Sequence, residues 1–218
     1  MAENQCVFIV DDDRAVRESL AALLDSAGFQ AETFDSGNAF LEAPDLTKGG
    51  CLVLDVRMPG LSGLEVQEKL AEKQHMMPVI IITGHGDLPM AVKAMKVGAI
   101  DFIEKPFDDD VIIDSVRSAL EKSAESWREA NRAADIEQRL ARLTTREREV
   151  LDELVIGNLN KVIAFNLGIS SRTVEIHRAR AMEKMQARNL AHLVRLALTA
   201  GVVPEVSLQD SDPKAHLT

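Results

Sequence analysis

Short apolar runs alternate with amphipathic segments through the first half of the chain, and this alternation restricts the possible folds more than any other feature. The apolar runs predict five strands, at residues 7–10, 31–34, 51–55, 79–83 and 101–105. Amphipathic patterns between them predict helices at residues 14–26, 64–74 and 87–97. The runs VFIV, CLVL and VIII have no polar side, which suits strands buried on both faces. We therefore expect an α/β domain: a five-stranded, doubly wound parallel sheet.

Composition excludes several classes of protein. The chain has 218 residues, of which 46% are hydrophobic and 28% charged, so it is too rich in apolar residues to be disordered throughout. Its longest apolar runs, such as residues 76–82 with Pro78 inside, fall short of the roughly 18 residues that a membrane span needs. The start of the chain does not resemble a signal peptide. Two cysteines, Cys6 and Cys51, fit the reduced cytosol, so we expect a cytoplasmic protein with no membrane partner.

Charge is distributed unevenly along the chain. Residues 1–141 hold 14 basic and 26 acidic side chains (net −12), and residues 142–203 hold 10 and 6 (net +4). This asymmetry favours an acidic control domain joined to a domain that binds a polyanion. A run without Gly or Pro predicts a helical linker between them, and residues after it show only helical periods. The predicted divisions are 1–124, a linker at 125–142, an all-α domain at 143–203 and a disordered tail at 204–218.

Polar side chains gather at the predicted carboxyl ends of the strands. Asp11 and Asp12 follow the first strand, Asp55 ends the third, Thr83 ends the fourth and Lys105 ends the fifth. Chemistry in an open parallel sheet collects at this edge. Clustered carboxylates repel one another unless a hard cation lies between them, and Mg²⁺ takes oxygen ligands. We therefore expect a magnesium site with a lysine that pairs with a carboxylate or a phosphoryl oxygen.

Four motifs at this edge carry a family resemblance. VDDD at 10–13, LVLDVRMPGLSGLE at 52–65, VIIITG at 79–84 and DFIEKPF at 101–107 resemble the receiver domain of two-component response regulators. The resemblance covers about residues 5–122. It implies that Asp55 is the phosphoacceptor and receives its phosphoryl group from a sensor histidine kinase. A carboxylate is a competent nucleophile for this transfer, and its acyl phosphate product is labile.

The resemblance also implies roles for the neighbouring residues. Asp12, Asp55 and the backbone carbonyl of Arg57 would hold Mg²⁺, and Asp11 would act through a water molecule. Thr83 and Lys105 would contact the phosphoryl oxygens.

The same resemblance implies a switch. Thr83 would move toward the phosphoryl group while Phe102, the switch aromatic, becomes buried. That movement would change the surface of residues 87–97 and 101–105, through which the family commonly dimerises. The protein would then be a phosphoacceptor and not an enzyme, with at most slow self-dephosphorylation.

The segment NKVIAFNLGISSRTVEIHRARAM at 160–182 has the pattern of a helix-turn-helix. Ala164 permits two helices to approach closely, Gly168 supplies the turn, and Ser170 or Ser171 caps the second helix. A helical wheel of that second helix places four residues inward: Val174, His177, Ala181 and Met185. It places six outward: Arg172, Glu175, Ile176, Ala179, Arg180 and Glu183. Such an outer face suits the major groove of DNA.

A second resemblance follows from LTTREREVL at 143–151 and the motif at 156–178. This part resembles the LuxR-type four-helix DNA-binding domain, and the whole chain is similar to FixJ-like regulators. By that resemblance, the candidates for contacts with the DNA backbone are Lys161, Arg172, Thr173 and His177. Candidates for base contacts are Glu175, Ile176 and Ala179, with Arg180 on the same outer face. The FixJ-like resemblance favours transcription activation by a phosphorylation-induced homodimer that engages RNA polymerase.

Two other functions compete with this interpretation. In a phosphatase of the haloacid dehalogenase type, Asp11 to Asp13 would supply nucleophile and acid, but Asp55 would have no role. A receiver that controls a protein partner without DNA would leave the basic segment unexplained. Cys6 and Cys51 open strands that we expect to be neighbours, so they are either core cysteines or a redox pair. We conclude in favour of a transcription regulator controlled by phosphorylation.

Overall fold

A computed structural model describes residues 5–43, 49–73, 75, 77–84 and 86–202. The predicted tail at 204–218 lies outside the described residues. The chain divides into two compact units, Met1–Glu129 and Ala130–Thr218. The division falls within the segment expected to be the linker, and each unit is described by itself below.

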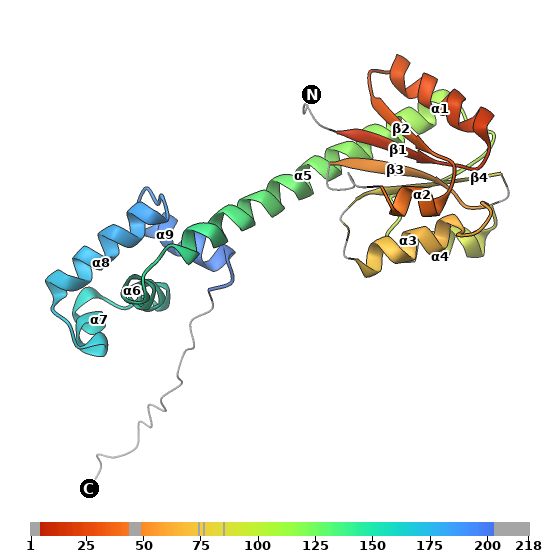
Figure 1. The fold of residues 1–218 in the computed structure, drawn as a ribbon. Helices are drawn as coiled ribbons and strands as arrows, with labels where there is room; N and C mark the ends of the chain where they lie inside the picture. Colours follow the sequence, from red (N-terminus) through yellow and green to blue (C-terminus); the bar gives the residue numbers. More distant parts are fainter. Residues whose placement is uncertain (1–4, 44–48, 74, 76, 85, 203–218) are drawn as a thin grey trace, which may run out of the picture. The chain divides into compact units, whose positions relative to one another are not determined.

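The first unit is built on a parallel sheet of five strands (Figure 1). The strands run in the order β2-β1-β3-β4-β5, and every neighbouring pair is parallel. Their bounds are β1 Cys6–Val10, β2 Gln30–Phe34, β3 Gly50–Asp55, β4 Val79–Thr83 and β5 Asp101–Glu104. The predicted strands are confirmed to within one residue at each end. β3 and β4 are buried along their whole length, which explains why their sequences lack polar alternation.

Helices cover both faces of this sheet (Figure 1). Their bounds are α1 Arg14–Ser26, α2 Gly37–Leu41, α3 Gly63–Glu72, α4 Leu88–Lys96 and α5 Asp109–Ala141. Residues of α1 and α5 share one core with one face of the sheet, and residues of α2, α3 and α4 share another core with the opposite face. The sequence did not predict α2, since five residues are too few to show a helical period. Among the described helices, none is both long and apolar enough to cross a membrane.

The two cysteines lie on opposite faces of the sheet. Cys6 packs against the core beneath α3 and α4, whereas Cys51 belongs to the core beneath α1 and α5. Burial raises the pKa of the Cys51 thiol well above its ordinary value, so this thiol stays protonated. Because successive side chains of a strand alternate between faces, the sheet itself separates the two sulfur atoms. Of the two alternatives, the structure supports core cysteines and not a redox pair.

The middle of α5 contacts the amino-terminal edge of the sheet. The hydroxyl of Ser123 accepts a hydrogen bond of 3.1 Å from the backbone N–H of Gly50, and both groups are buried. One turn further along, the indole of Trp127 lies over Gly49, where an added Cβ would come within 3.2 Å of its Cδ1 atom. These contacts extend the first unit along α5 past Leu120.

The second unit consists of the end of α5 and four further helices. Their bounds are α6 Thr145–Ile156, α7 Asn160–Leu167, α8 Ser171–Lys184 and α9 Leu190–Thr199. Its core contains residues of all five helices, including Ile136 and Leu140 of α5. Glu147, which completes the capping box of α6, is buried and accepts an ion-pair bond of 2.6 Å from Lys184. Burial alone would raise the pKa of Glu147, but the bonds from Lys184 and Thr144 outweigh it and lower that pKa.

The turn between α7 and α8 has the predicted helix-turn-helix geometry. Gly168 ends α7 in the left-handed conformation, with φ at 65°, which other residues rarely adopt. Ser170 is the residue that caps α8, since its hydroxyl accepts from the N–H of Thr173. Ala164 is buried, as its proposed role in close helix packing requires.

The tie between α5 and the sheet leads to a stability prediction. Ser123→Ala removes the acceptor of the buried Gly50 N–H, so we expect a loss of about 1–3 kcal/mol in the free energy of unfolding. Urea unfolding followed by the fluorescence of Trp127, the only tryptophan, measures it. Ser118→Ala, on an exposed position of the same helix, is the matched control and should change stability by less than about 0.5 kcal/mol. If the two variants are equally stable, the hydrogen bond between Ser123 and Gly50 does not contribute to stability.

Candidate functional site

Four neighbouring strands bring the predicted site residues to one edge of the sheet. Asp11 follows β1, Asp55 ends β3, Thr83 ends β4 and Lys105 follows β5. Since these strands are parallel and adjacent in the order β1-β3-β4-β5, their carboxyl ends meet. The backbone N–H of Lys105 donates to the carbonyl of Thr83 at 2.8 Å, which aligns the ends of the last two strands.

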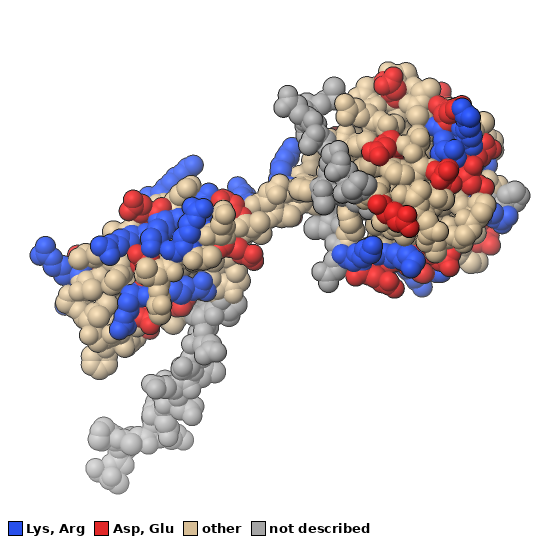
Figure 2. Space-filling view, viewed as in Figure 1, with Lys and Arg blue, Asp and Glu red and all other residues tan. Residues whose placement is uncertain are grey.

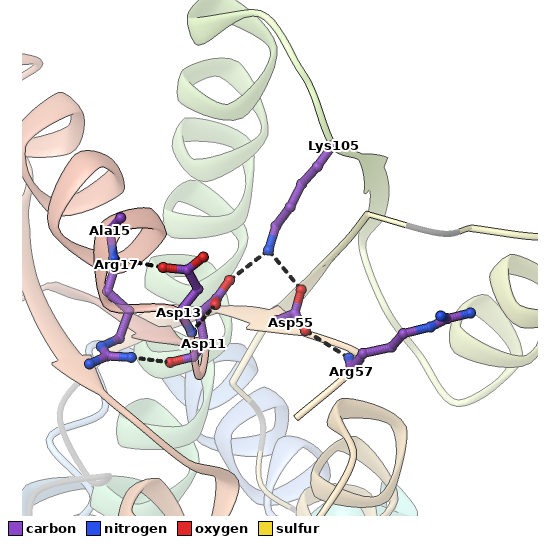
Figure 3. A network of polar contacts seen from close by, with 7 residues as sticks. All are labelled: Asp11, Asp13, Ala15, Arg17, Asp55, Arg57 and Lys105. Atoms are coloured by element: carbon purple, nitrogen blue, oxygen red, sulfur yellow. Dashed lines mark hydrogen bonds and ion pairs between the residues drawn. The ribbon is translucent and has the colours of Figure 1, made fainter. Parts of the chain in front are cut away.

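Lys105 bridges the two buried carboxylates of this edge (Figure 3). Its Nζ lies 2.6 Å from Oδ2 of Asp11 and 2.7 Å from Oδ1 of Asp55. Burial alone would lower the pKa of Lys105, but its bonds to Asp11 and Asp55 outweigh burial and raise that pKa. The lysine therefore remains a cation at neutral pH.

Asp55 is a strongly confined carboxylate. Only 5% of its surface is exposed, and its second oxygen, Oδ2, accepts from the backbone N–H of Arg57 at 2.7 Å. The side chain of Arg57 is exposed and points away from the pocket in Figure 3. Burial raises the pKa of Asp55 above the ordinary aspartate value, although the hydrogen bond from Lys105 acts in the opposite direction. The ionised carboxylate is therefore poorly solvated, and further positive charge beside it is favoured.

The predicted metal ligands are only partly gathered. Asp11 and Asp55 meet at Lys105, whereas Asp12 is exposed on the rim. Within the ranges that the structure describes, no cluster of three or more His, Cys, Asp or Glu side chains is close enough to hold a metal ion. The donor set still fits Mg²⁺, because that ion keeps several waters and needs only one or two carboxylates. Because two buried carboxylates share one ammonium, this edge keeps a net negative charge that favours binding of Mg²⁺.

The predicted switch residues lie beside this pocket. Thr83 is fully buried at the end of β4, and Phe102, on β5, is half-buried against the core beneath α3 and α4. The ring of Phe102 lies against Gly86 in the loop that leads to α4: a Cβ added there would meet the ring at 2.9 Å and the methyl group of Thr83 at 3.3 Å. A side chain at position 86 would therefore compete with the aromatic ring for space.

Sequence reasoning missed Arg17. Its guanidinium reaches back from α1 and donates to the backbone carbonyl of Asp11 at 2.6 Å (Figure 3). Residues three or four apart are neighbours on a helix, but Asp11 and Arg17 are six apart, so the sequence pattern could not predict this bond.

The second unit presents a basic helix surface. Figure 2 shows Lys and Arg gathered over the helices α6–α9, whereas Asp and Glu are numerous on the first unit. The helical wheel predicts six outward residues on α8, and five of these are also candidates for DNA contact. The structure confirms that all five are exposed: Arg172, Glu175, Ile176, Ala179 and Arg180. Lys161, on α7, is exposed as well.

Two other candidates for DNA contact are less open. The hydroxyl of Thr173 lies 2.8 Å from that of Ser170, within the cap of α8. His177 is half-buried, and its Nδ1 is buried without a hydrogen-bond partner among the described residues. Val174, Ala181 and Met185 are fully buried, which confirms the inward face of the helical wheel.

Comparisons with known families agree with this two-part architecture. Residues 7–117 match the family described as "Response regulator receiver domain", and residues 141–197 match "Bacterial regulatory proteins, luxR family". The receiver match includes Asp55, which a phosphatase mechanism leaves without a role, so the haloacid dehalogenase alternative is wrong. The second match disfavours a receiver that acts without DNA.

Known proteins resemble the chain over most of its length. The transcriptional regulatory protein FixJ of Azorhizobium caulinodans is 53% identical over 94% of this chain and 97% of its own. FixJ of Rhizobium meliloti is 51% identical over 91% of this chain and 97% of its own. Among solved structures, the response regulator StyR has a TM-score of 0.83 at 46% identity, over 89% of this chain and 98% of its own. Full-length FixJ from B. japonicum has a TM-score of 0.55 at 47% identity, over 93% of this chain and 100% of its own.

The polar site at the carboxyl edge of the sheet and the helix-turn-helix thus occur in one chain, and the relatives match the chain over both parts. The chain belongs to the FixJ-like response regulators, transcriptional regulators in which a receiver domain is joined to a LuxR-type DNA-binding domain.

Proposed function

We propose that a sensor histidine kinase phosphorylates this regulator on Asp55 and that the modification controls its binding to DNA. The observation that carries the proposal is the pair of bonds from Lys105 to Asp11 and Asp55 at the carboxyl edge of the sheet. This geometry supports phosphoryl transfer because a cation already lies beside the nucleophilic oxygen. The regulator acts where its DNA is, in the cytoplasm.

The transfer is a displacement at phosphorus. An oxygen of Asp55 forms the new bond to phosphorus while the bond between phosphorus and the histidine nitrogen of the kinase breaks, and the nitrogen keeps that electron pair. Lys105 neutralises charge that develops on the phosphoryl oxygens. Mg²⁺, when bound, would supply further positive charge to those oxygens; Asp11, Asp12, Asp55 and the carbonyl of Arg57 would hold it.

The phosphorylated state acts through Thr83, Lys105 and Phe102. Phosphorylation replaces the single negative charge of the Asp55 carboxylate by the charge of about −2 on an acyl phosphate, so the new phosphoryl oxygens draw the Thr83 hydroxyl and the Lys105 ammonium toward them. Movement of Thr83 frees space near Gly86, into which the ring of Phe102 turns. The acyl phosphate is lost by slow hydrolysis, which ends the signal.

We assign dimerisation to the surface of α4 and β5. The outer face of α4 carries Leu88, Val92 and Met95, which are 78%, 43% and 48% exposed. These positions lie one helical turn apart, so they form a continuous apolar stripe. Two DNA-binding units in a dimer can hold two half-sites, and the dimer then recruits RNA polymerase and activates transcription.

The first test concerns the nucleophile. Incubation of the full chain with Mg²⁺ and a small acyl-phosphate donor should add one phosphoryl group, measured by the mass of the intact protein. Asp55→Asn should abolish the addition, because an amide oxygen is a poor nucleophile. Asp13→Asn is the matched control: Asp13 caps α1 outside the pocket, and asparagine also caps helices. Persistent phosphorylation of Asp55→Asn would refute the assignment.

The second test separates the two kinds of DNA contact. Lys161→Met should weaken binding to every sequence alike and make the salt dependence shallower by about one unit. Ile176→Ala should instead change which bases are preferred, because Ile176 lies on the outer face of α8. Both are measured by titration of labelled DNA at several salt concentrations. A Lys161 variant with altered base preference and an unchanged slope would contradict the assignment.

The third test concerns the dimer. Val92→Asp places a charge in the apolar stripe, so it should weaken the dimer of the phosphorylated protein roughly tenfold or more while phosphorylation itself continues. Sedimentation equilibrium of the phosphorylated and unphosphorylated protein measures this. Ala22→Asp, at an exposed position of α1, is the control and should leave the dimer intact. If phosphorylation leaves the monomer–dimer equilibrium of the wild type unchanged, dimerisation has no part in the mechanism.

A further inference from the structure

The turn between β1 and α1 is held by a small network around Asp11 (Figure 3). Oδ1 of Asp11 accepts from the N–H of Asp13 at 2.8 Å, and Oδ1 of Asp13 accepts from the N–H of Ala15 at 2.8 Å. Arg17 completes the network, since its guanidinium donates to the carbonyl oxygen of Asp11 at 2.6 Å. Each bond joins the turn either to itself or to the first turns of α1.

The bond from Arg17 acts on a particular peptide group. The carbonyl of Asp11 belongs to the peptide that joins Asp11 to Asp12, so its direction sets the direction from which the Asp12 side chain starts. The side chain of Asp11 is fixed independently by Lys105 and by the N–H of Asp13. Hydrogen bonds from charged donors are short and strong, which suits a fixed orientation.

We propose that Arg17 is a positioning residue for the divalent cation: it holds the Asp11–Asp12 peptide so that both carboxylates can serve one ion. The proposal rests on the magnesium site of the proposed function. It adds a residue outside the set of ligands, one that touches neither the cation nor the phosphoryl group. Mutation of a group that orients a metal ligand commonly lowers metal affinity by about tenfold or more.

The charge of Arg17 acts in the opposite sense to its proposed role. A guanidinium near the acidic edge repels a dication, so removal of the charge alone should strengthen Mg²⁺ binding. Loss of the positioning bond should weaken it. The sign of the change in affinity therefore distinguishes the two roles, and a purely structural role would lower the stability of the metal-free protein without a change in affinity.

Arg14 provides a matched control on the same helix. It is exposed, and its guanidinium pairs with Glu18 on the surface of α1 at 2.7 Å. Arg17→Met and Arg14→Met remove the same charge and keep a similar apolar stem, but only the first removes the bond to the turn.

The experiment measures the dissociation constant of Mg²⁺ for the full chain by isothermal titration with magnesium chloride. Arg17→Met should bind Mg²⁺ roughly tenfold more weakly than the wild type. Arg14→Met should bind it equally well or slightly more tightly. Arg17→Met with unchanged or tighter binding, or Arg14→Met with an equal loss, would overturn the proposal.

Two further variants keep the test decisive. Arg17→Lys retains the charge but replaces the planar guanidinium with a compact ammonium on a shorter side chain, so it should also lose affinity; wild-type affinity would show that the guanidinium is not needed to position the turn and would overturn the proposal. It serves as well if Arg17→Met fails to fold. Asp12→Asn tests the metal site itself. If Asp12→Asn binds Mg²⁺ as the wild type does, the proposed ligand set is wrong; if it loses affinity and Arg17→Met does not, only the role of Arg17 is wrong.

Discussion

Two carboxylates buried at one edge of a sheet repel each other, and the ammonium of Lys105 between them makes the receiver pocket possible. Asp11 is 1% exposed and Asp55 is 5% exposed, so water does little to screen them. One ammonium for two carboxylates leaves the edge negative. This imbalance favours a cation at the edge, because the protein solvates the ionised Asp55 carboxylate incompletely. The parallel register of β1, β3, β4 and β5 maintains this arrangement, since it aligns the ends of the four strands.

The helix α5 belongs to both units, because its two ends pack into different hydrophobic cores. Ile112 and Val116 belong to a core of the first unit, and Ile136 and Leu140 belong to the core of the second. No Gly or Pro interrupts the 33 residues of the helix. Each unit therefore has its own hydrophobic core, and a single unbroken helix joins the two cores. Ser123 and Trp127 fix the helix against the sheet edge opposite the pocket.

The proposed DNA-contacting helix, α8, divides specificity from affinity. Arg172 and Arg180 are exposed on this helix, but its central outward positions are Glu175, Ile176 and Ala179. Cations that contact phosphates bind any sequence, whereas acidic and apolar side chains discriminate between base edges. In the proposed function, the basic charge of residues 142–203 therefore supplies general attraction to DNA, and the few residues of this face supply the choice of site.

Much of the architecture follows from the sequence alone. Periodicity located all five strands, and the ends of α1 and β4 agree with the structure because caps and buried runs are local signals. Pocket residues could be named because parallel strands place their carboxyl ends together. Local patterns gave no sign of α2, which is too short, or of the bond between Gly50 and Ser123, which are 73 residues apart. Nor could they show that Cys6 and Cys51 face opposite sides or that Arg17 reaches the carbonyl of Asp11. Those contacts depend on how separate elements pack, and a period of two or 3.6 residues carries no information about the partner it packs against.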